Sequence, residues 1–377
     1  MRALLCLLPG LGDALVASPL IDGAANAGWE LDVLAMLDPV ADYARALPQV
    51  HEVVSFDLLA GQHNAIPVVA RLRRDRYDVA ILPFPAPRWQ YHALVAACGS
   101  RRAIAHDYGG IARTIDRLAG VAMIRLRGGH RFSENARLAT ALGLAYDGAR
   151  YVLPDAWRSP PRAGLLGVHP GSMKYKGNER RRWPLERFAQ LIRMSSDKGR
   201  AVRLFVGPAE RDEVAAIVAL AGGQGVDVVD APLGAAARAL SECEVFVGND
   251  AGFAHLASGL GVKTVTLYGM TDPVRSQPVG ESIAVRPSSC PPCHDEGMRT
   301  FACVLDIGYR CSQEDLAVDD AMDAIDRAFA ASALAFEPAE SGDYRLYGRP
   351  VKIVPATSAI DSTAHSKAEA SEIASGT

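Results

Sequence analysis

Apolar and polar positions along the chain divide it into two alternating kinds of segment. Short, mainly apolar segments at 3–8, 31–37 and 77–84, the last two with one aspartate each, are typical of buried parallel strands. Longer segments have helical spacing, such as HRFSENARLATALGL at 130–144, which has Gly143 near its end. This alternation predicts a parallel sheet covered by helices.

The second half of the chain repeats the pattern after a break. The segment YVLPDAWRSPPRA at 151–163 is rich in proline and has no periodicity, which is typical of a linker between domains. Beyond it we expect strands at 164–171, 201–207, 226–231, 243–248 and 263–269, and helices at 184–199, 208–223, 234–242 and 252–261. The prediction is an α/β chain with two Rossmann-like, doubly wound domains facing a cleft, at 1–155 and 164–335, followed by a polar and largely disordered tail at 336–377.

Composition narrows the class of protein. A chain of 377 residues is too long for one typical core and suits two domains. With 49% apolar residues and a net charge of -3, the chain offers no global reason to expect nucleic acid as a partner. No stretch approaches the roughly 18 uninterrupted apolar residues of a transmembrane helix.

The opening stretch MRALLCLLPGLGDALVASPL admits two interpretations. A secretory signal has an apolar core of about 7–15 residues, whereas the run here is interrupted by Pro9 and Gly10, and Asp13 follows. We favour a buried strand, a glycine-rich turn and a helix from about Asp13. This interpretation predicts a cytoplasmic protein.

Residues 248–261, GNDAGFAHLASGLG, form the first candidate binding loop. Gly248 and Gly252 let the backbone approach a ligand, and the first free N–H groups of the following helix make a site for an anion. Asp250 has a structural alternative as the cap of that helix. His255 lies one turn inside the helix, and its structural alternative is a partly buried histidine with satisfied hydrogen bonds.

A basic loop follows the strand at 164–171. It reads HPGSMKYKGNERRRWP and carries Lys174, Lys176, Arg180, Arg181 and Arg182. Arginine and lysine at the end of a strand suit a pyrophosphate group. The alternative is a solvated surface loop, which most runs of charge are. Because an anion-ready helix start is expected in the same domain, we favour phosphate binding.

The glycine turn at 9–19, PGLGDALVASP, is the third candidate. Gly10 and Gly12 permit a tight turn, but no third glycine completes a dinucleotide fingerprint. Asp13 is the first carboxylate after the strand, and facing an interdomain cleft it would serve as a general base. The structural alternative for Asp13 is a helix N-cap.

Together these three stretches resemble glycosyltransferase family 9, the heptosyltransferase-like enzymes of the GT-B fold. The resemblance covers most of 1–330 and rests on GLGDALVASPL, on HPGS followed by RRRWPLERFAQL, and on VGNDAGFAHLASGLGVKTVTLYGMTDP. The last is the most specific, because a D-x-G-x-x-H-L-A loop is followed by a strand and a G-x-T-D-P turn. The resemblance implies inverting, metal-independent transfer of a sugar from a nucleotide donor, expected to be ADP-heptose.

The resemblance also implies roles for individual residues. Asp13 would deprotonate the acceptor hydroxyl. Arg181 stands where the family often has a lysine, and arginine can bind phosphate with two donors. Either Glu210 or Asp212 would bind the nucleoside, and the sequence does not choose between them. The other donor-side residues are Gly12, Ser172, Lys174, Arg182, Asp250, Ala251, Gly252 and His255.

The acceptor side is less defined. The stretch LPFPAPRWQYH at 82–92 follows a strand, and its Arg88, Trp89 and Tyr91 are candidate acceptor contacts. Weaker candidates are His130 and Asn135. The acceptor would be a lipopolysaccharide core, another glycan or a protein hydroxyl. The short basic patch RLRRDR at 71–76 suggests a peripheral contact with an anionic membrane surface.

The cysteines fall into two groups. Cys6, Cys98 and Cys243 are isolated in apolar surroundings and are interpreted as core residues. The others have the spacing C-x2-C-x9-C-x7-C, and four thiolates would complete a closed tetrahedral metal site, with His294 as an alternative ligand: Cys290, Cys293, Cys303 and Cys311. We expect structural zinc or iron there and no catalytic cofactor. The alternative is four reduced cysteines in a surface loop.

Two other functions remain open at the level of sequence. One is a GT-B transferase that uses a different nucleotide sugar, in secondary metabolism. The other is a scaffold that binds nucleotide without catalysis, and the presence of both Asp13 and the phosphate loops weighs against it. Turnover would distinguish them, because a scaffold would bind nucleotide without transferring sugar.

Overall fold

The computed structural model describes most of the chain and divides it into two compact units. The first unit comprises Met1–Val152 together with Glu340–Thr377, and the second comprises Leu153–Ala339. The described residues are 1–57, 61, 64–146, 150–172, 178–207, 210–223, 225–287, 290, 292–293, 303, 306–334, 344–346 and 349–351.

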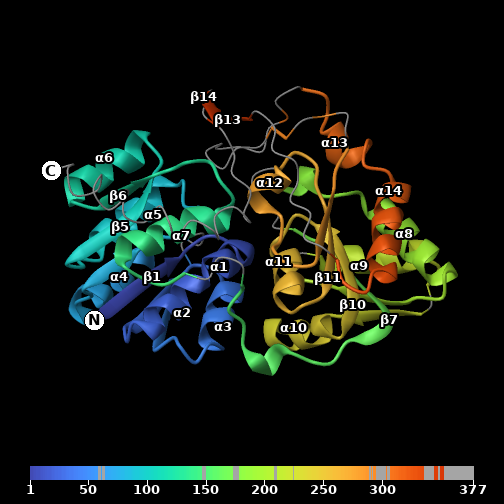
Figure 1. Cartoon of the computed structure of the whole chain (residues 1–377), viewed down its shortest axis with the longest axis horizontal. Helices are drawn as coiled ribbons and strands as arrows, with labels where there is room; N and C mark the ends of the chain where they lie inside the picture. The colour runs from blue at the N-terminus through green and yellow to red at the C-terminus, as the bar shows by residue number, and fades with distance from the viewer. Residues whose placement is uncertain are drawn as a thin grey trace. The chain divides into compact units, whose positions relative to one another are not determined.

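The first unit is built on a six-stranded, wholly parallel sheet in the order β3-β2-β1-β4-β5-β6 (Figure 1). Its central strand buries every residue after the first, as a parallel strand covered on both faces must. The strands are β1 (Arg2–Leu7), β2 (Glu30–Ala35), β3 (Glu52–Ser55), β4 (Val79–Ile81), β5 (Arg102–Asp107) and β6 (Ala122–Arg125).

Helices cover this sheet. They are α1 (Leu11–Ala17), α2 (Pro19–Asn26), α3 (Asp38–Arg45), α4 (Ala65–Asp75), α5 (Trp89–Ala97), α6 (Gly110–Ala119) and α7 (Arg131–Leu142). Local sequence sets their ends: α7 begins after His130, whose ring accepts the Phe132 N–H, and stops at Gly143 in the left-handed conformation. Leu4, Cys6, Leu34 and Tyr77 lie in the buried core of this unit.

The second unit repeats the architecture with the order β12-β11-β10-β7-β8-β9, again wholly parallel. Its strands are β7 (Arg162–His169), β8 (Ala201–Phe205), β9 (Val226–Val229), β10 (Cys243–Asn249), β11 (Lys263–Leu267) and β12 (Ser282–Val285). Its helices are η2 (Asp155–Trp157), η3 (Asn178–Arg181), α8 (Leu185–Asp197), α9 (Arg211–Leu220), α10 (Leu233–Ser241), α11 (Gly252–Gly259), α12 (Pro273–Ser276), α13 (Arg310–Gln313) and α14 (Val318–Ala330).

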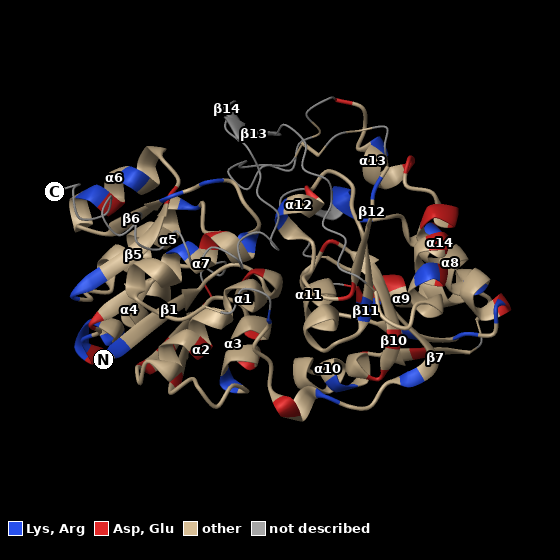
Figure 2. Ribbon diagram, in the orientation of Figure 1, with Lys and Arg blue, Asp and Glu red and all other residues tan. Residues whose placement is uncertain are grey.

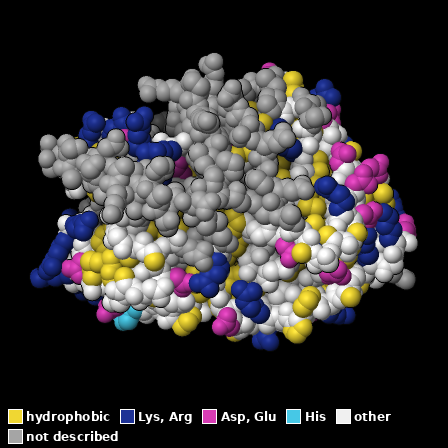
Figure 3. Space-filling view, viewed as in Figure 1, with side chains coloured by type: hydrophobic (Ala, Val, Ile, Leu, Met, Phe, Trp, Pro, Cys, Tyr) yellow, Lys and Arg dark blue, Asp and Glu magenta, His cyan; other side chains and the backbone are white. Residues whose placement is uncertain are grey.

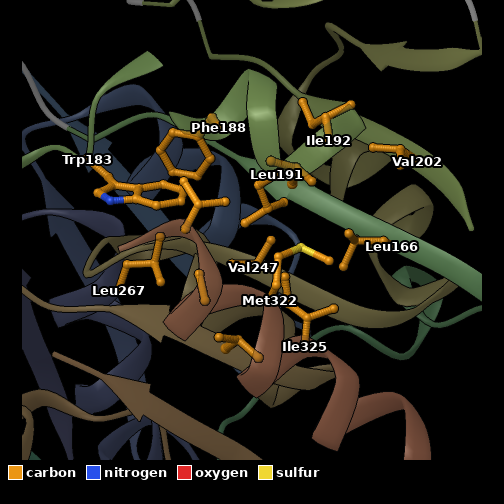
Figure 4. Packing of buried hydrophobic residues seen from close by; sticks show 14 of the residues in the cluster. Leu166, Trp183, Phe188, Leu191, Ile192, Val202, Val247, Leu267, Met322 and Ile325 are labelled. Atoms are coloured by element: carbon orange, nitrogen blue, oxygen red, sulfur yellow. The ribbon is translucent and has the colours of Figure 1, made fainter. Parts of the chain in front are cut away.

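The core of the second unit lies between its sheet and helices α8 and α14. Trp183 and Phe188 pack edge to face, with ring centroids 5.0 Å apart. Figure 4 shows these rings turned toward Val247, Leu267 and Met322. The Trp183 indole N–H donates to the Leu316 carbonyl at 2.8 Å, so the tryptophan is buried with its polar atom satisfied.

Counted within each unit, the two strand orders are the same doubly wound order, 3-2-1-4-5-6. In such sheets the direction of winding reverses between the first and fourth strands, and ligands bind beyond the carboxyl ends of those strands. Here these are β1 and β4 in one unit, and β7 and β10 in the other. The predicted fold class of two Rossmann-like domains is confirmed.

Two short strands are the only part of the tail at 336–377 that the structure describes. Tyr344–Leu346 (β13) and Arg349–Val351 (β14) pair in antiparallel fashion. The predicted disorder of the rest concerns residues outside the described part of the chain. Within the described residues, no helix is both long enough and apolar enough to cross a membrane.

Candidate functional site

The carboxyl ends of β7 and β10 lie side by side in the second unit. A Cβ atom on Gly248 would lie 2.9 Å from the His169 carbonyl oxygen, so only glycine fits this approach. Next along β10, the Asn249 amide donates to the Pro170 carbonyl at 2.7 Å and accepts the Trp183 N–H at 2.9 Å. One buried side chain at the end of β10 therefore holds both ends of the loop between β7 and α8, and no sequence motif singled it out.

Helix α11 begins at this edge without a side-chain cap. Its N-cap is Ala251, in extended conformation, and its first residue is Gly252. Asp250 instead continues the sheet, with its N–H donating to the Leu267 carbonyl at 3.1 Å. His255 is buried within the helix. Among the described residues no side chain caps α11, which favours the anion-binding hypothesis over the capping alternative.

Arg182 is buried at the same edge, among carboxylates. Its guanidinium pairs with Glu210 at 2.5 Å and with Glu213 at 3.2 Å. It also donates to the Ser172 hydroxyl at 3.3 Å and to the Ser172 carbonyl. These contacts anchor the loop after β7 to the residues after β8, so the structure places Arg182 as a support for this loop.

Glu210 fits tightly between two glycines. A Cβ atom on Gly171 would lie 2.6 Å from the Glu210 carboxyl carbon, and one on Gly207 would lie 2.7 Å from its Oε2 atom. By contrast, Asp212 is exposed in the first turn of α9. Of the two residues that the sequence left open, Glu210 is the one that the structure brings next to Ser172.

An aromatic stack completes the edge. The rings of His169 and Phe253 are nearly parallel, with centroids 4.5 Å apart. Burial lowers the pKa of His169 to about 3, and the nearby positive charge of Arg182 contributes in the same direction. His169 is therefore a neutral ring at physiological pH.

The remaining basic residues of the loop are only partly described. Arg181 is half-buried at the end of η3, and Arg180 is exposed, with its guanidinium over the Tyr309 ring at 5.3 Å. Lys174 and Lys176 lie outside the described residues.

In the first unit, the glycine turn and its carboxylate follow β1. Helix α1 starts at Leu11 with Gly10 as its N-cap, so Asp13 lies in the first turn and is not the cap. Gly12 is half-buried beside it. The Asp13 carboxylate pairs with Arg131 Nη1 at 2.9 Å, a partner 118 positions away that the sequence analysis did not identify.

The candidate acceptor residues after β4 differ in exposure. Trp89 opens α5 with 40% of its surface exposed, and Arg88 is exposed just before it. Tyr91 is buried, 6.0 Å from the Arg88 guanidinium by its ring centroid. Arg88 and Trp89 are therefore at the surface, whereas Tyr91 belongs to the core of the unit.

His130 and Asn135 are buried and engaged with the backbone. His130 caps α7. The Asn135 amide accepts the Phe84 N–H at 2.8 Å and donates to the Phe84 carbonyl at 3.0 Å. Both ends of the amide are thus used to hold the loop after β4, which is a structural task.

Three of the four clustered cysteines lie near one another. Cys290 and Cys311 are buried against Met270, with Cys293 packed on them, and the Cys293 N–H donates to the Met270 carbonyl at 2.9 Å. Burial and the neighbouring cysteines raise the pKa of Cys311 to about 11. Among the described residues, no group of three or more His, Cys, Asp or Glu side chains is placed to hold a metal ion. His294 lies outside those residues.

Comparison with known proteins relates this geometry to a family. Residues 158–301 match the model of glycosyltransferase family 9 (heptosyltransferase). The resemblance to glycosyltransferase family 9 is confirmed. A curated relative, lipopolysaccharide heptosyltransferase 3 of Escherichia coli, is 22% identical over 285 residues, which cover 71% of this chain and 83% of the relative. These two matches confirm the prediction that the chain is a glycosyltransferase.

Solved structures of family 9 share the whole architecture. A family 9 glycosyltransferase from Veillonella parvula superposes with a TM-score of 0.68 at 19% identity, covering 87% of this chain and 97% of that one. Escherichia coli ADP-heptose LPS heptosyltransferase II gives 0.64 at 18% identity, with coverage of 87% and 98%. At this identity the likeness establishes the fold, which is GT-B.

Proposed function

We propose that this chain transfers a heptose-like sugar from ADP-heptose to a hydroxyl group of a lipopolysaccharide core, another glycan or a protein, with inversion and without a catalytic metal. The observation that carries the proposal is the convergence at the ends of β7 and β10. There the uncapped start of α11, the loop at Ser172 and the buried Glu210 meet.

The donor is inferred from chemistry and from relatives together. The N–H groups at the start of α11 and the half-buried Arg181 would stabilise negative charge on a diphosphate. Glu210 would accept hydrogen bonds from ribose hydroxyls, held in place by Arg182. Solved relatives include Escherichia coli heptosyltransferase WaaC with ADP and with ADP-2-deoxy-2-fluoro heptose, which favours ADP over other nucleotides.

The reaction is a single in-line displacement. Asp13 takes the proton of the acceptor hydroxyl while the acceptor oxygen forms a bond to the anomeric carbon. The bond from that carbon to the diphosphate oxygen breaks, and the leaving nucleoside diphosphate keeps the electron pair. Positive groups of the second unit stabilise that leaving charge, which is the task a divalent metal performs in other transferases.

The acceptor side is inferred from exposure. Trp89 and Arg88 are the exposed candidates after β4, and an aromatic face with a guanidinium beside it suits a sugar that carries an anionic substituent. His130 and Asn135 would act through the backbone that they hold, without touching the acceptor.

We propose a structural zinc or iron ion at the cysteine cluster. Cys290, Cys293 and Cys311 already lie together, and thiolates suit either metal. Elemental analysis of the purified protein should find about one ion per chain, lost in Cys293→Ser and retained in Cys98→Ser. Absence of metal from the wild type would overturn this proposal.

A peripheral membrane contact in the cytoplasm is also proposed, with α6 as its surface. In the patch at 71–76, Arg71 pairs with Glu52 and Arg73 donates to the Ala97 carbonyl, whereas Arg74 and Arg76 are exposed and would add positive charge to this surface. On α6, Leu118 is 85% exposed. The helix also carries Arg113 and Arg117, and Figure 2 colours basic positions on its ribbon. Figure 3 shows basic side chains at the surface in the same part of the molecule. Apolar residues beside arginine suit an anionic lipid surface.

The test of the membrane contact is sedimentation with vesicles that contain anionic lipid. Leu118→Asp should reduce the bound fraction, whereas Leu220→Asp, at an exposed position on α9, should not. If both variants sediment with the vesicles to the same extent as the wild type, α6 has no role in the membrane contact.

The decisive experiment on function compares turnover with binding. Asp13→Asn should reduce sugar transfer by roughly 100-fold or more while the affinity for ADP stays within about twofold of the wild type. Asp319→Asn, at an exposed position on α14, is the matched control and should leave both unchanged. Turnover retained in Asp13→Asn would refute the assignment of the base. Binding of nucleotide without any transfer by the wild type would favour a scaffold.

A further inference from the structure

The loop that precedes α7 is held by one buried carboxylate. Oε1 of Glu134 accepts the backbone N–H groups of Arg127, Gly128 and Gly129 at 2.9, 2.8 and 3.3 Å. Glu134 is 1% exposed, so these bonds form away from water. Burial raises the pKa of this carboxyl, and the three N–H groups act in the opposite direction.

The anchored loop leads directly to Arg131, the first residue of α7. Gly128 adopts a positive φ of 76°, which other residues rarely adopt, and this turn brings the chain to His130 and Arg131. The Arg131 guanidinium then lies 2.9 Å from Oδ1 of Asp13, and both side chains are mostly buried, at 16% and 22% exposure. The proposed role of Asp13 as a base does not by itself explain why an arginine lies beside its carboxylate.

We propose that Arg131 is a positioning residue for Asp13, and that Glu134 fixes the loop from which Arg131 reaches it. The inference rests on the proposed role of Asp13 as the base. The guanidinium keeps the Asp13 carboxylate ionised, and therefore ready to accept a proton, and fixes the direction of its oxygens. Because the pair is largely shielded from solvent, the interaction is screened less than one on the surface.

Other charged groups on the elements packed against α1 have their own partners. Asp22 on α2 pairs with Arg150. Asp42 on α3 pairs with Arg45. On α7 itself, the His130 ring accepts the Phe132 N–H. Arg131, in contrast, directs its guanidinium to Asp13.

Two substitutions of Arg131 separate charge from packing. In Arg131→Gln the positive charge is lost, and in Arg131→Lys it is kept. In Arg131→Gln we expect the acidic limb of the pH–rate profile to shift to higher pH by roughly one unit. In Arg131→Lys the limb should lie close to that of the wild type. Arg102→Gln, exposed at the opposite, amino-terminal end of the sheet, should leave the limb unchanged.

A direct measurement does not depend on turnover. In protein labelled with ¹³C at the aspartate carboxyl carbons, the resonance absent from Asp13→Asn belongs to Asp13. It should titrate at higher pH in Arg131→Gln than in the wild type. An unchanged titration and an unchanged acidic limb, with only a lower melting temperature, would make Arg131 a structural residue and overturn the inference.

Glu134 supplies an independent arm of the test. Glu134→Gln keeps an oxygen for the three N–H groups and should behave like the wild type, whereas Glu134→Leu removes it and should shift the Asp13 titration as Arg131→Gln does. If Glu134→Leu does not fold, Arg131→Gln still decides the matter. The two proposals can fail separately. If the Asp13 titration shifts in Arg131→Gln but the Asp13→Asn variant retains turnover, the pairing with Arg131 is supported and the role of Asp13 as the base is refuted.

Discussion

At the scale of single residues, the guanidinium of Arg182 is a buried charge that lies between two carboxylates of the second unit. It pairs with the buried Glu210 and with the partly exposed Glu213, and it donates to the hydroxyl and carbonyl oxygens of Ser172. A buried ion pair contributes little net stability against an apolar replacement of both partners, but removal of one partner leaves the other charge unpaired in a poorly solvated place.

Arg182→Leu should therefore lower the free energy of unfolding by about 3–5 kcal/mol, measured by urea denaturation, and should weaken nucleotide binding. The matched control is Arg211→Leu, which breaks an exposed pair with Asp230 and should change neither measurably. Equal stability of the two variants would contradict the buried pairing of Arg182.

Acid should destabilise the protein through His169. The folded protein holds this ring neutral down to a pKa of about 3, whereas the unfolded chain takes up the proton near pH 6.5. The unfolded state thus binds more protons between these values, and stability falls as the pH drops through that window. His169→Gln should lose less stability between pH 6.5 and pH 4.5 than the wild type in parallel urea titrations. Equal losses would contradict a neutral buried His169.

His51 should act in the opposite direction. Its hydrogen bond to Asp32, at 2.8 Å, raises the pKa of His51. The stability that it contributes is fully present below the unfolded value near pH 6.5 and is lost as the pH rises through the folded pKa. The difference in melting temperature between the wild type and His51→Gln should therefore shrink from pH 6 to pH 8.5. A constant difference would show that the Asp32 contact is absent in solution.

At the scale of elements, Asn249 couples the end of β10 to its surroundings. Asn249→Asp keeps the oxygen that accepts the Trp183 N–H but sets a carboxylate against the Pro170 carbonyl, where the amide now donates. We expect a loss of about 1–3 kcal/mol in stability and a weaker affinity for ADP. Asn26→Asp, at an exposed position at the end of α2, serves as the comparison. Unchanged ADP affinity in Asn249→Asp would separate this residue from the site.

The elements that the sequence predicted are those with long or uninterrupted patterns. Strands such as β1, β7 and β10 were expected because their apolar runs end at glycine or proline. Strands β3, β6 and β12 were not expected, and each has only four residues. A run of that length has no distinctive periodicity, so strands this short are predicted only in part: β9 also has four residues and was expected. The first helix begins at Leu11, slightly before the position expected from Asp13, since helix ends are the least defined part of any pattern.

The partners of the candidate site residues were less accessible to sequence reasoning. Arg131 is 118 positions from Asp13, and Glu210 is 28 positions from Arg182. Arginine in a basic loop is interpreted as a phosphate ligand unless a carboxylate is known to be near, and only the fold brings one there. Asn249 lies inside the motif at 248–261. Its sequence position alone did not distinguish it from neighbouring polar residues, because its hydrogen bonds to Pro170 and Trp183 depend on the fold.

At the scale of the whole molecule, each unit has a hydrophobic core of its own. We expect differential scanning calorimetry to resolve two transitions. Phe188→Ala should lower the midpoint temperature of the second unit's transition, by an amount that corresponds to a loss of about 3–5 kcal/mol in stability. Leu94→Ala should lower the midpoint temperature of the first unit's transition. A single transition lowered by both variants would contradict two independently folding units.

The central claim is that the second unit binds an ADP-sugar, and calorimetric titration with ADP, UDP, GDP and CMP tests it most directly. We predict that ADP binds most tightly and that Asp13→Asn binds it as well as the wild type. Glu210→Ala should bind ADP at least tenfold more weakly, a loss of about 1.4 kcal/mol in binding free energy. Preference for another nucleotide would contradict the proposed donor. Failure to bind any of the four would contradict the proposed site itself.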